Sequence, residues 1–374
     1  MPVTVSDIIR LMDSIAPPHL AEKWDNSGLQ IGDPNWPVQS IMVALDPLPE
    51  VVADACQKGI DFLITHHPLI FKPLSRIDFA TPAGSIVRHS VQSKMALFAA
   101  HTNLDSVKGG INDILSEKIG LTDVRVLSEA APAARCKLVF YVPADFEQKL
   151  LDALFQTRAG VIGSYSCCSF RTSGTGTFRP GAAATPFIGR VGSLSEVDEI
   201  RIETVVAKRD VDEVVACLKK SHPYETMAYD IYPLHPEKGE AGLGRIGTLP
   251  ETMGLGEFSR QVAGRLHLSR VRTAGNPRLV VKRAAICSGS GSSLLGDFFS
   301  SGAQVFISGD LRYHDARAIE EAGLGMIDIG HFGSEHLVKD ELVKKLREVI
   351  SATGMDVSVE ACTCEKDPFV VYSS

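Results

Sequence analysis

The sequence lacks both the long apolar runs of a membrane protein and the leader pattern of a secreted one. None of its 374 residues falls in an apolar stretch long enough to span a bilayer. Near the N-terminus, where a secretory signal would be uninterrupted, Asp7, Arg10 and Asp13 break up the apolar residues. We interpret this segment as an amphipathic helix with Ser6 as its N-cap and an end at Pro17. We therefore expect a soluble, cytoplasmic protein with no membrane partner.

An excess of positive charge is also missing. Lys and Arg number 38 against 45 Asp and Glu, which gives a formal net charge of -7. General nucleic-acid binders and membrane-surface proteins normally carry a basic field, so the charge balance argues against either class of partner. A local basic pocket for a small anion is still compatible with this balance.

The eight cysteines lack the spacing of a disulfide framework or a zinc module. They are scattered along the chain without a CxxC pair, so we expect reduced and mostly buried thiols. Cys362 and Cys364 could together contact a soft metal. A strand near the C-terminus explains the pair as well, and we favour the strand.

In its first third, the sequence alternates apolar strands with amphipathic helices. The pattern predicts strands at 40–46 and 61–68, helices at 49–59 and 85–94, and a strand at 95–105 that runs into a loop. Such alternation is typical of a parallel sheet covered by helices on both faces. In these sheets, functional residues gather beyond the carboxyl ends of the strands.

The middle of the chain follows a different order. The pattern predicts a strand, a helix, a hairpin, a second helix and a last strand, with the strands at 137–143, within 161–180, at 199–208 and at 227–234. The resulting β-α-β-β-α-β order is that of the ferredoxin-like split unit.

From about residue 241 the alternation of the first third returns. We therefore predict a discontinuous α/β parallel-sheet domain, with helices on both faces, made of residues 1–130 and 241–374. A ferredoxin-like α+β insertion at residues 131–240 interrupts it.

Residues of metal-ligand type follow the predicted strands of the first third. His66 and His67 end one strand, and at a frayed strand end such a pair can converge on two adjacent ions. Packing or capping explains a lone histidine pair about as well. His101 and Asp105 follow the next strand, and imidazole with carboxylate suits Zn, Fe or Mn. Taken alone, this second pair is better explained as an ordinary loop.

The C-terminal third contributes two further segments of this kind. His331 and Glu335 lie four residues apart across a strand-to-helix turn, so both can face one cleft, although capping is an alternative explanation. Asp310 and His314 also follow an apolar strand. As catalytic residues they could shuttle protons, or they could orient ligand histidines or contact a substrate. A turn residue and a helix-surface histidine explain them equally well, and we assign His336 to a helix surface.

The combination of these segments is more informative than any one of them. Three of them, the segments that contain His66, His101 and His331, fall at the ends of three predicted strands of one parallel sheet. Together they offer more ligands than a single zinc ion takes, which is about three or four. They suit two ions bridged by a carboxylate and a water. The candidate metal ligands are His66, His67, His101, Asp105, His331 and Glu335.

Other polar motifs carry less chemistry. The glycine-rich segments at 173–178 and 287–293 lack the GK[ST] of a P-loop. The second could bind an anion through backbone N–H groups at a helix start, but a tight strand-to-helix turn is the simpler explanation. We interpret the HPYE sequence at 222–225 as a turn that ends a helix.

Eight segments match, in order, the pattern of one known family. The sequence resembles the dinuclear-metal-centre hexameric family, which is GTP cyclohydrolase type 2-like and Nif-three-like, over nearly the whole chain. The insertion resembles an optional domain that some members carry. The matching segments are AEKWDNSGLQIGD (21–33), THHPLIFKP (65–73), HTNLDSVKGGIND (101–113), SGTGTFRPG (173–181), HPYETMAYDIYPL (222–234), GSGSSLL (289–295), SGDLRYHDA (308–316) and GHFGSE (330–335).

The resemblance implies a toroidal homohexamer, built as a dimer of trimers, with metals inside a central cavity. It also implies two divalent metal ions per subunit, of Zn, Fe or Mn, with His101 as a less secure ligand. The family name implies a small-molecule substrate of nucleotide type. The ligands it implies are His66, His67, Asp105, His331 and Glu335.

Two functions remain compatible with these residues. A metal-dependent hydrolase would attack an electrophilic carbon, such as C8 of a guanine ring, and then the resulting formamide. The alternative is a non-catalytic metal-bearing scaffold, carrier or regulator. The predicted insertion motivates this second function, because such modules often bind effectors or mediate assembly.

Overall fold

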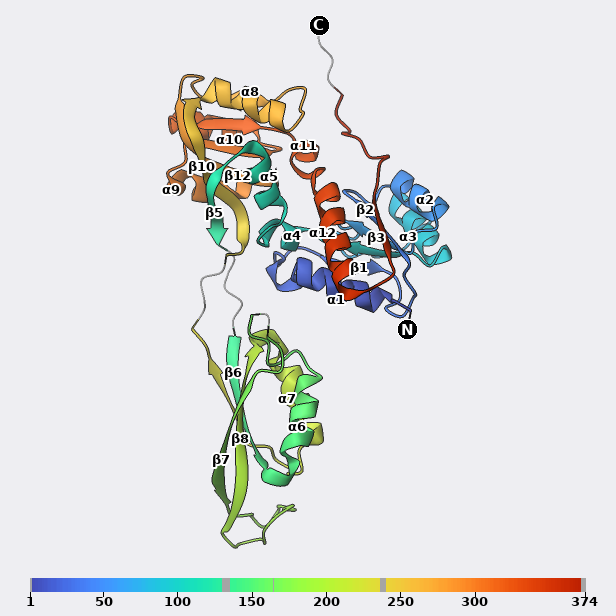
Figure 1. Cartoon of the computed structure of the whole chain (residues 1–374), viewed down its shortest axis with the longest axis vertical. Helices are drawn as coiled ribbons and strands as arrows, with labels where there is room; N and C mark the ends of the chain where they lie inside the picture. Colours follow the sequence, from blue (N-terminus) through green and yellow to red (C-terminus); the bar gives the residue numbers. More distant parts are fainter. Residues whose placement is uncertain (1, 130–134, 164, 236–239, 371–374) are drawn as a thin grey trace. The chain divides into compact units, whose positions relative to one another are not determined.

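The chain folds into two compact units and is a mixed α/β protein with several sheets (Figure 1). The larger unit comprises residues 1–130 and 239–374, and the smaller unit comprises residues 131–238. In the part of the chain that the structure describes, no helix has the length and apolar character needed to cross a membrane. The computed structural model describes residues 2–129, 135–163, 165–235 and 240–370.

The first sheet of the larger unit has five strands in the order β1-β4-β3-β2-β15. β15, β2, β3 and β4 run parallel, and β1 pairs antiparallel with β4. Ile41 and Val43 pack against α1 and α12 on one face, while Met42 and Ala44 pack against α2 and α3 on the other. The elements are α1 Val5–Ile15, β1 Gly28–Ile31, β2 Ser40–Ala44, α2 Pro49–Gln57, β3 Phe62–Thr65, α3 Pro82–Gln92, β4 Ala96–Ala99, α12 Val338–Thr353 and β15 Ser358–Ala361.

The start of α1 differs from the expectation. Ser6 is not its N-cap, because the helix begins at Val5 and Thr4 occupies the capping position. The Asp7 carboxylate accepts hydrogen bonds from the backbone N–H of Thr4 at 2.8 Å and from its hydroxyl at 2.7 Å. An acidic residue three positions after the cap can satisfy the cap's own N–H, which fixes the start of the helix at Thr4.

The second sheet of the larger unit has six strands in the order β11-β14-β13-β12-β10-β5. β12, β13 and β14 are parallel, and the other three pairings are antiparallel. Helices α5 and α8 cover one face, and α9 and α10 cover the other. The elements are α5 Ile111–Ile119, β5 Thr122–Glu129, β10 Gly242–Gly254, α8 Leu255–Arg265, β11 Arg272–Ala274, β12 Val280–Ser290, α9 Leu295–Ser301, β13 Val305–Gly309, α10 Tyr313–Glu321 and β14 Gly325–Asp328.

The expectation of one parallel sheet is therefore wrong, because the larger unit has two mixed sheets. Helices do cover both faces of each. The central strands of both sheets are short, apolar and buried on both faces, as β3 and β13 illustrate. Such a pattern indicates that a strand is buried, but it does not indicate which sheet the strand joins.

The smaller unit contains a four-stranded antiparallel sheet in the order β7-β8-β6-β9. Along the chain, its elements follow the order strand, helix, strand, strand, helix, strand. Phe140 and Ile202 pack against Leu150 and Leu218 of the two helices, so both helices cover the same face. The elements are β6 Arg135–Pro143, α6 Glu147–Phe155, β7 Ser169–Phe178, β8 Ser195–Ala207, α7 Val211–Ser221 and β9 Tyr229–Pro233.

Short helices and the cysteines complete the description. All eight cysteines are free, but only three are buried, so the expectation of mostly buried thiols is wrong. Strand β15 ends at Ala361, just before Cys362, whose Sγ lies 3.3 Å from that of Cys364. The short helices are η1 Pro18–Leu20, α4 Thr102–Ser106, η2 Ala144–Phe146, η3 Lys208–Asp210, η4 Ser292–Leu294 and α11 His331–Glu335.

Candidate metal centre

The first half of the candidate site lies at the carboxyl ends of β3 and β4. His66 and His67 directly follow β3, and their backbone N–H groups donate to the carbonyls of Ala44, the last residue of β2, and of Leu45, which follows it. His101 follows β4 as the N-cap position of α4, and Asp105 lies on that short helix. Because parallel strands end at the same edge of a sheet, these four side chains gather in one place.

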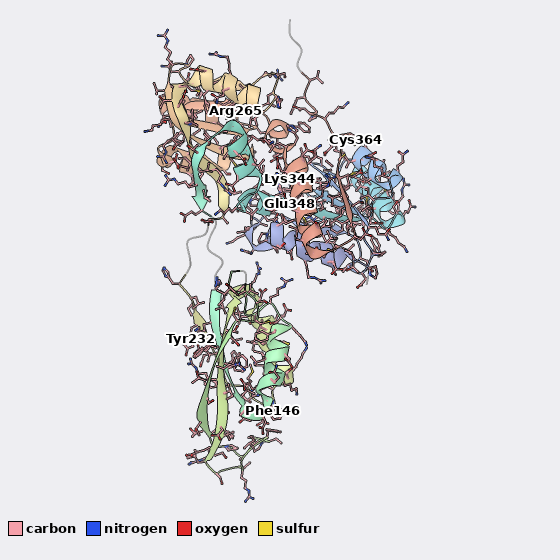
Figure 2. The ribbon with its side chains drawn as sticks, in the orientation of Figure 1. Phe146, Tyr232, Arg265, Lys344, Glu348 and Cys364 are labelled. Atoms are coloured by element: carbon pink, nitrogen blue, oxygen red, sulfur yellow. The ribbon has the colours of Figure 1, made fainter. Side chains whose placement is uncertain are left out.

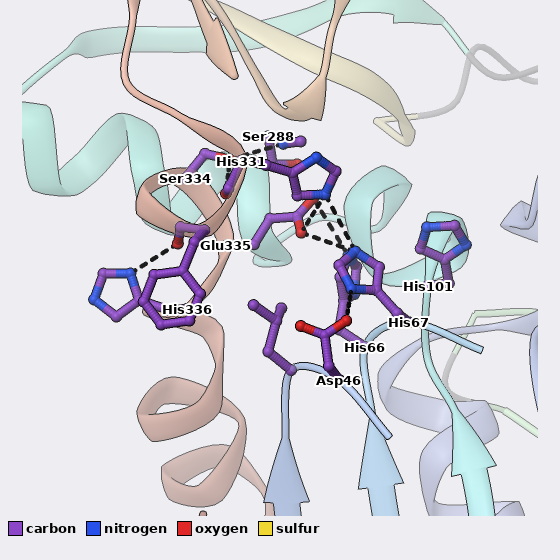
Figure 3. A network of polar contacts seen from close by, with 12 residues as sticks. Asp46, His66, His67, His101, Ser288, His331, Ser334, Glu335 and His336 are labelled. Carbon is purple, nitrogen blue, oxygen red and sulfur yellow. Dashed lines mark hydrogen bonds and ion pairs between the residues drawn. The ribbon is translucent and has the colours of Figure 1, made fainter. Parts of the chain in front are cut away.

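The second half of the site comes from the second sheet. After β14 the chain turns at Gly330, whose φ of 75° is a conformation that favours glycine. The turn leads into α11, which carries His331 and Glu335 (Figure 3). Gly289, at the end of β12, has a second structural role here. A Cβ atom at that position would lie 2.3 Å from Oε1 of Glu335, so any side chain would displace the carboxylate.

The structure brings together all six residues that the sequence singles out as metal ligands. In the described part of the chain they form three overlapping groups, in which the ligand atoms lie within 4.8 Å of one another. These groups could hold metal ions. They are His66, His67 and His101; His67, His331 and Glu335; and His66, Asp105 and Glu335.

Each histidine of the cluster uses its Nδ1 atom for a hydrogen bond to an oxygen. An acceptor at Nδ1 fixes the proton there and leaves a lone pair on Nε2, which is the usual arrangement of metal-binding histidines. The four Nε2 atoms are thereby available to a cation. The four Nδ1 contacts are His66 to the Ala100 carbonyl at 2.8 Å, His67 to Asp46 at 2.8 Å, His101 to Asp25 at 2.7 Å and His331 to Asp310 at 2.8 Å.

The Nε2 atoms and carboxylates face one another without satisfying one another. His67 Nε2 lies 3.3 Å from His331 Nε2, an approach of two nitrogens that a shared cation would explain (Figure 3). Among the described residues, buried His66 Nε2 and Glu335 Oε2 have no partner in hydrogen-bonding geometry. Buried polar atoms are rarely left without a partner, so the donor set fits metal ions.

The carboxylate of Glu335 is the centre of the cluster. Its Oε1 lies 3.6 Å from Nε2 of His66, and its Oε2 lies 3.0 Å from Nε2 of both His67 and His331. The side chain is only 4% exposed, so these contacts are made away from solvent. Each oxygen therefore faces a different set of ring nitrogens, as a carboxylate between two ions would.

Asp105 contributes one free oxygen to the same cluster. Its Oδ1 accepts a hydrogen bond from the hydroxyl of Ser288 at 2.6 Å, whereas Oδ2 lies 3.9 Å from Nε2 of His66. The side chain of Asn112 bonds to both Asp105 and Ser288. Its amide nitrogen donates to the backbone carbonyl of Asp105, and its amide oxygen accepts from the backbone N–H of Ser288. Ser288 of β12 and Asn112 of α5 thus fix the orientation of Asp105.

The electrostatics of the cluster also favour cations. Burial alone would raise the pKa of Glu335, but His66, His331 and His67 hold that pKa well below its ordinary range. Burial would lower the pKa of His67, but the nearby carboxylates of Asp46 and Glu335 raise it to about 10. The close carboxylate of Glu335 is the largest cause that raises the pKa of His331 to about 9. Without metal, therefore, protons are bound where metal ions would otherwise sit.

The remaining predicted residues have different surroundings. Asp310 adopts a left-handed φ of 52° and accepts from His331, so it orients a cluster histidine. His314 is exposed on α10, and its described ring contact is with Tyr313, so the structure does not bring it to the cluster. His336 stacks on Phe332 at 5.0 Å and donates to the Phe332 carbonyl, away from the cluster.

Two functional residues were missed by sequence reasoning. Asp46 follows β2 and holds His67, and Asp25 holds His101. Hydrogen bonds with His101 and Thr102 keep the pKa of Asp25 below its ordinary range despite its burial. Asp25 lies in the segment 21–33, which matches the family pattern, so a signal was present. Asp46 follows an apolar strand, as many turn residues do.

A cavity of about 820 Å³ opens beside the cluster. His67, Asp310 and His331 line it on one side, and Arg270 and Arg272 line it elsewhere. Arg272 also forms an ion pair with Asp328. The cluster therefore borders a space of substrate size whose lining combines two arginines with the carboxylates of Asp46, Asp310, Asp328 and Asp367.

Comparison with known proteins places this geometry in a family context. The family model described as Duf34/NIF3 (NGG1p interacting factor 3) matches residues 3–368. A Halalkalibacterium halodurans protein named "GTP cyclohydrolase 1 type 2 homolog" is 38% identical over 362 residues, covering 97% of each chain. A Bacillus subtilis protein of the same name is 38% identical and covers 98% of each chain.

Solved structures resemble this chain over its full length. A Bacillus cereus protein described as related to NIF3 has a TM-score of 0.78 and 38% identity, with 100% of both chains covered. A Staphylococcus aureus protein has a TM-score of 0.75 and 30% identity, with 99% of both chains covered. The fold of this chain is thus shared with proteins of experimentally determined structure.

Proposed function

This chain belongs to the Duf34/NIF3 family, and from that premise we propose that it is a dinuclear metal-dependent hydrolase acting on a nucleotide-type substrate. One observation carries the proposal. Four histidines donate through Nδ1 to fixed oxygens, and their Nε2 atoms converge with two buried carboxylates. Such a donor set is larger than one ion of Zn, Fe or Mn requires.

We assign the ligands from the overlap of the groups. His66 and Asp105 would hold one ion, His67 and His331 the other, and Glu335 would bridge them through its two oxygens. His101 shares a group with His66 and His67, so it is an additional ligand candidate. When bound, a pair of divalent ions supplies Lewis acidity and a nucleophilic water at neutral pH.

The chain's own residues support such a reaction by orientation and charge. Asp46 and Asp310 hold the rings of His67 and His331 with their Nε2 atoms inward. Asp310 is half exposed, so its carboxylate can also accept a proton at the edge of the cavity. Of the two arginines in that cavity, Arg272 is paired with Asp328, so Arg270 would contact the phosphate groups of a nucleotide.

The substrate class is supported by the names of the relatives, which are GTP cyclohydrolase 1 type 2 homologs. Hydrolytic opening of a guanine ring would begin with attack of water at C8 and continue with hydrolysis of the formamide. The test is turnover of GTP and related nucleotides by protein loaded in turn with Zn, Fe and Mn. The variants Glu335→Gln and His331→Ala should lose turnover, whereas His336→Ala should retain it. Equal turnover by all three variants would exclude the cluster as the catalytic centre.

A second candidate function is a non-catalytic metal-bearing scaffold or regulator. It is favoured by the smaller unit, whose described residues form a core of their own and include no ligand candidate of the cluster. Its strand order β7-β8-β6-β9 and its β-α-β-β-α-β connectivity support a ferredoxin-like module. Readily exchanged metal and inactivity across a hydrolase panel would favour this function over the first.

The assembly state is a further part of the proposal. The family resemblance supports a homohexamer built as a dimer of trimers. With a chain mass of 40.3 kDa, light scattering coupled to size exclusion distinguishes a hexamer from a trimer or monomer. A monomer at micromolar concentration would contradict this part without affecting the metal centre.

A further inference from the structure

The smaller unit contains a cavity of about 530 Å³ that no residue of the metal cluster lines. Its wall is made by β7, by the segment 179–188 and by residues 224–228. These stretches overlap two segments that match the family pattern, 173–181 and 222–234, and the proposed hydrolase uses neither. The volume falls within the usual range of small-molecule sites.

The floor of this cavity is the sheet face that carries no helix. Gly174 is paired with Glu199 across β7 and β8, and Arg201 is paired with both Thr172 and Tyr141. Directly paired residues point to the same face of a sheet, and the alternate residue Ile202 packs against the helices. The carboxylate of Glu199 and the guanidinium of Arg201 therefore belong to the open face.

Two glycines make the floor flat. A Cβ atom on Gly176 would lie 2.1 Å from Oε2 of Glu199, so the carboxylate rests where a side chain would otherwise be. A Cβ atom on Gly174 would meet no atom within 4 Å, so the space above this residue is open. The result is a slot with one acidic group on its floor, which suits a flat molecule with N–H donors.

Aromatic rings form the side of the slot. The ring of Tyr224 lies 5.9 Å from that of Phe178 and 6.4 Å from that of Phe187. Phe187 also contacts Phe146, with ring centroids 5.5 Å apart. Phe146 precedes α6 in the smaller unit (Figure 2). Such rings offer both stacking surface and edge contacts to a planar ligand.

The hydroxyl of Tyr224 is the most informative polar group in the slot. It is buried and has no hydrogen-bond partner among the described residues. Burial and nearby Glu199 raise its pKa, so it stays a protonated donor. His222 holds the residue in place, because its Nδ1 accepts from the Tyr224 N–H at 3.1 Å and its Nε2 donates to the Tyr141 carbonyl at 2.8 Å. The HPYE sequence is thus more than a helix-ending turn.

We propose that this cavity binds a guanine nucleotide as a ligand distinct from any substrate of the metal centre. The adjacent N1–H and N2–H groups of guanine match the two oxygens of the Glu199 carboxylate, and its O6 matches the Tyr224 hydroxyl. Adenine would place a lone pair at N1 against the carboxylate, so it is disfavoured. Arg179, which is exposed at the end of β7, supplies positive charge for the phosphates. Glu225 offers less repulsion than its charge suggests, because it accepts from the Thr185 N–H.

The test separates this cavity from the metal centre. Full-length protein carrying Glu335→Gln is stripped of metal with a chelator and titrated calorimetrically with GDP and with ADP. GDP should bind, and ADP should bind at least about tenfold more weakly. Absence of GDP binding at about 1 mM ligand, or equal affinity for ADP, would overturn the proposal. Loss of GTP turnover in a separate assay would bear only on the hydrolase.

Substitutions of residues on the floor of the cavity test whether GDP binds there. Glu199→Gln should weaken GDP binding at least about tenfold. Asp198→Asn makes the same charge change one residue earlier, on a side chain that does not line the cavity, and should not alter it. Gly174→Val should block the slot, whereas Gly181→Val, which also has open space, should not. Should Gly174→Val prevent folding, Glu199→Gln still decides, and unchanged affinity in that variant would overturn the proposal.

Discussion

His67 and His331 face each other through their Nε2 atoms at 3.3 Å, although 264 residues separate them and they follow strands of different sheets. Both rings are fixed from behind, by Asp46 and by Asp310. An ion held between them would tie the first sheet to the second. A metal centre at this place would therefore also be a structural link, and its loss should affect stability as well as chemistry.

Metal removal should lower the thermal stability of the protein. A ligand that binds only the folded state stabilises it by about 4 kcal/mol when present at about 1,000 times its dissociation constant. Calorimetry of metal-loaded and chelated protein should therefore show a higher Tm for the loaded form. His331→Ala should lose most of this difference, while His336→Ala, whose ring stacks on Phe332, should keep it. A Tm that is the same before and after chelation would contradict metal binding between the sheets.

Single ligand substitutions should change metal stoichiometry in different ways. Wild-type protein should bind about two ions per chain. Asp105→Asn removes a ligand from the group with His66, but leaves the His67 and His331 pair intact, so about one ion should remain. Glu335→Gln should weaken the binding of both ions, because Oε1 of Glu335 faces His66 whereas Oε2 faces His331. Inductively coupled plasma mass spectrometry measures the result, and identical stoichiometry in the two variants would refute the bridging assignment.

The sequence predicted the local character of the site better than its assembly. The family resemblance is confirmed, and the residues singled out at strand ends, such as His66 and Glu335, do lie together. Among the residues that hold the histidines, Asp310 was a candidate from the sequence, whereas Asp46 could not be recognised, since it looks like any turn residue until the ring of His67 is placed beside it. The division into two sheets was also missed, because hydrophobic periodicity reports burial and not strand partners.

Metal-free protein should lose stability as pH rises through the alkaline range. The pKa of His67 is raised from 6.5 to about 10, and that of His331 from 6.5 to about 9. A histidine whose pKa is raised on folding contributes its full stabilisation of the folded state below about pH 6.5, its pKa in the unfolded chain. That contribution is lost as the pH rises through the higher pKa that the histidine has in the folded state. The Tm of chelated protein should thus fall between about pH 6.5 and pH 10. In loaded protein the ions replace these protons, so its Tm should fall less.

The control for this pH dependence is His67→Ala in the metal-free state. This substitution removes the imidazole whose pKa is raised most, so the fall of Tm with rising pH should become shallower. Glu335 does not complicate the measurement, because its pKa lies well below the range examined and it stays ionised throughout. A chelated wild-type Tm that is constant or rises between pH 6.5 and pH 10 would show that the imidazoles are not proton-loaded in the folded state.

Asp46→Asn should weaken metal binding without removing a ligand. The Asp46 carboxylate lies 2.8 Å from Nδ1 of His67, and an amide in its place would orient the ring less well and withdraw negative charge. Loss of such a support typically costs about 10–100-fold in metal affinity. Competition with a chromophoric chelator measures the change in metal affinity. The matched control is Asp33→Asn, because Asp33 is exposed and lies in a turn. The backbone N–H groups of Leu45 and Asp46 donate to the buried Glu365 carboxylate and hold this loop independently, so the variant should keep its fold. Wild-type affinity in Asp46→Asn would show that the ring of His67 is positioned by its own packing alone.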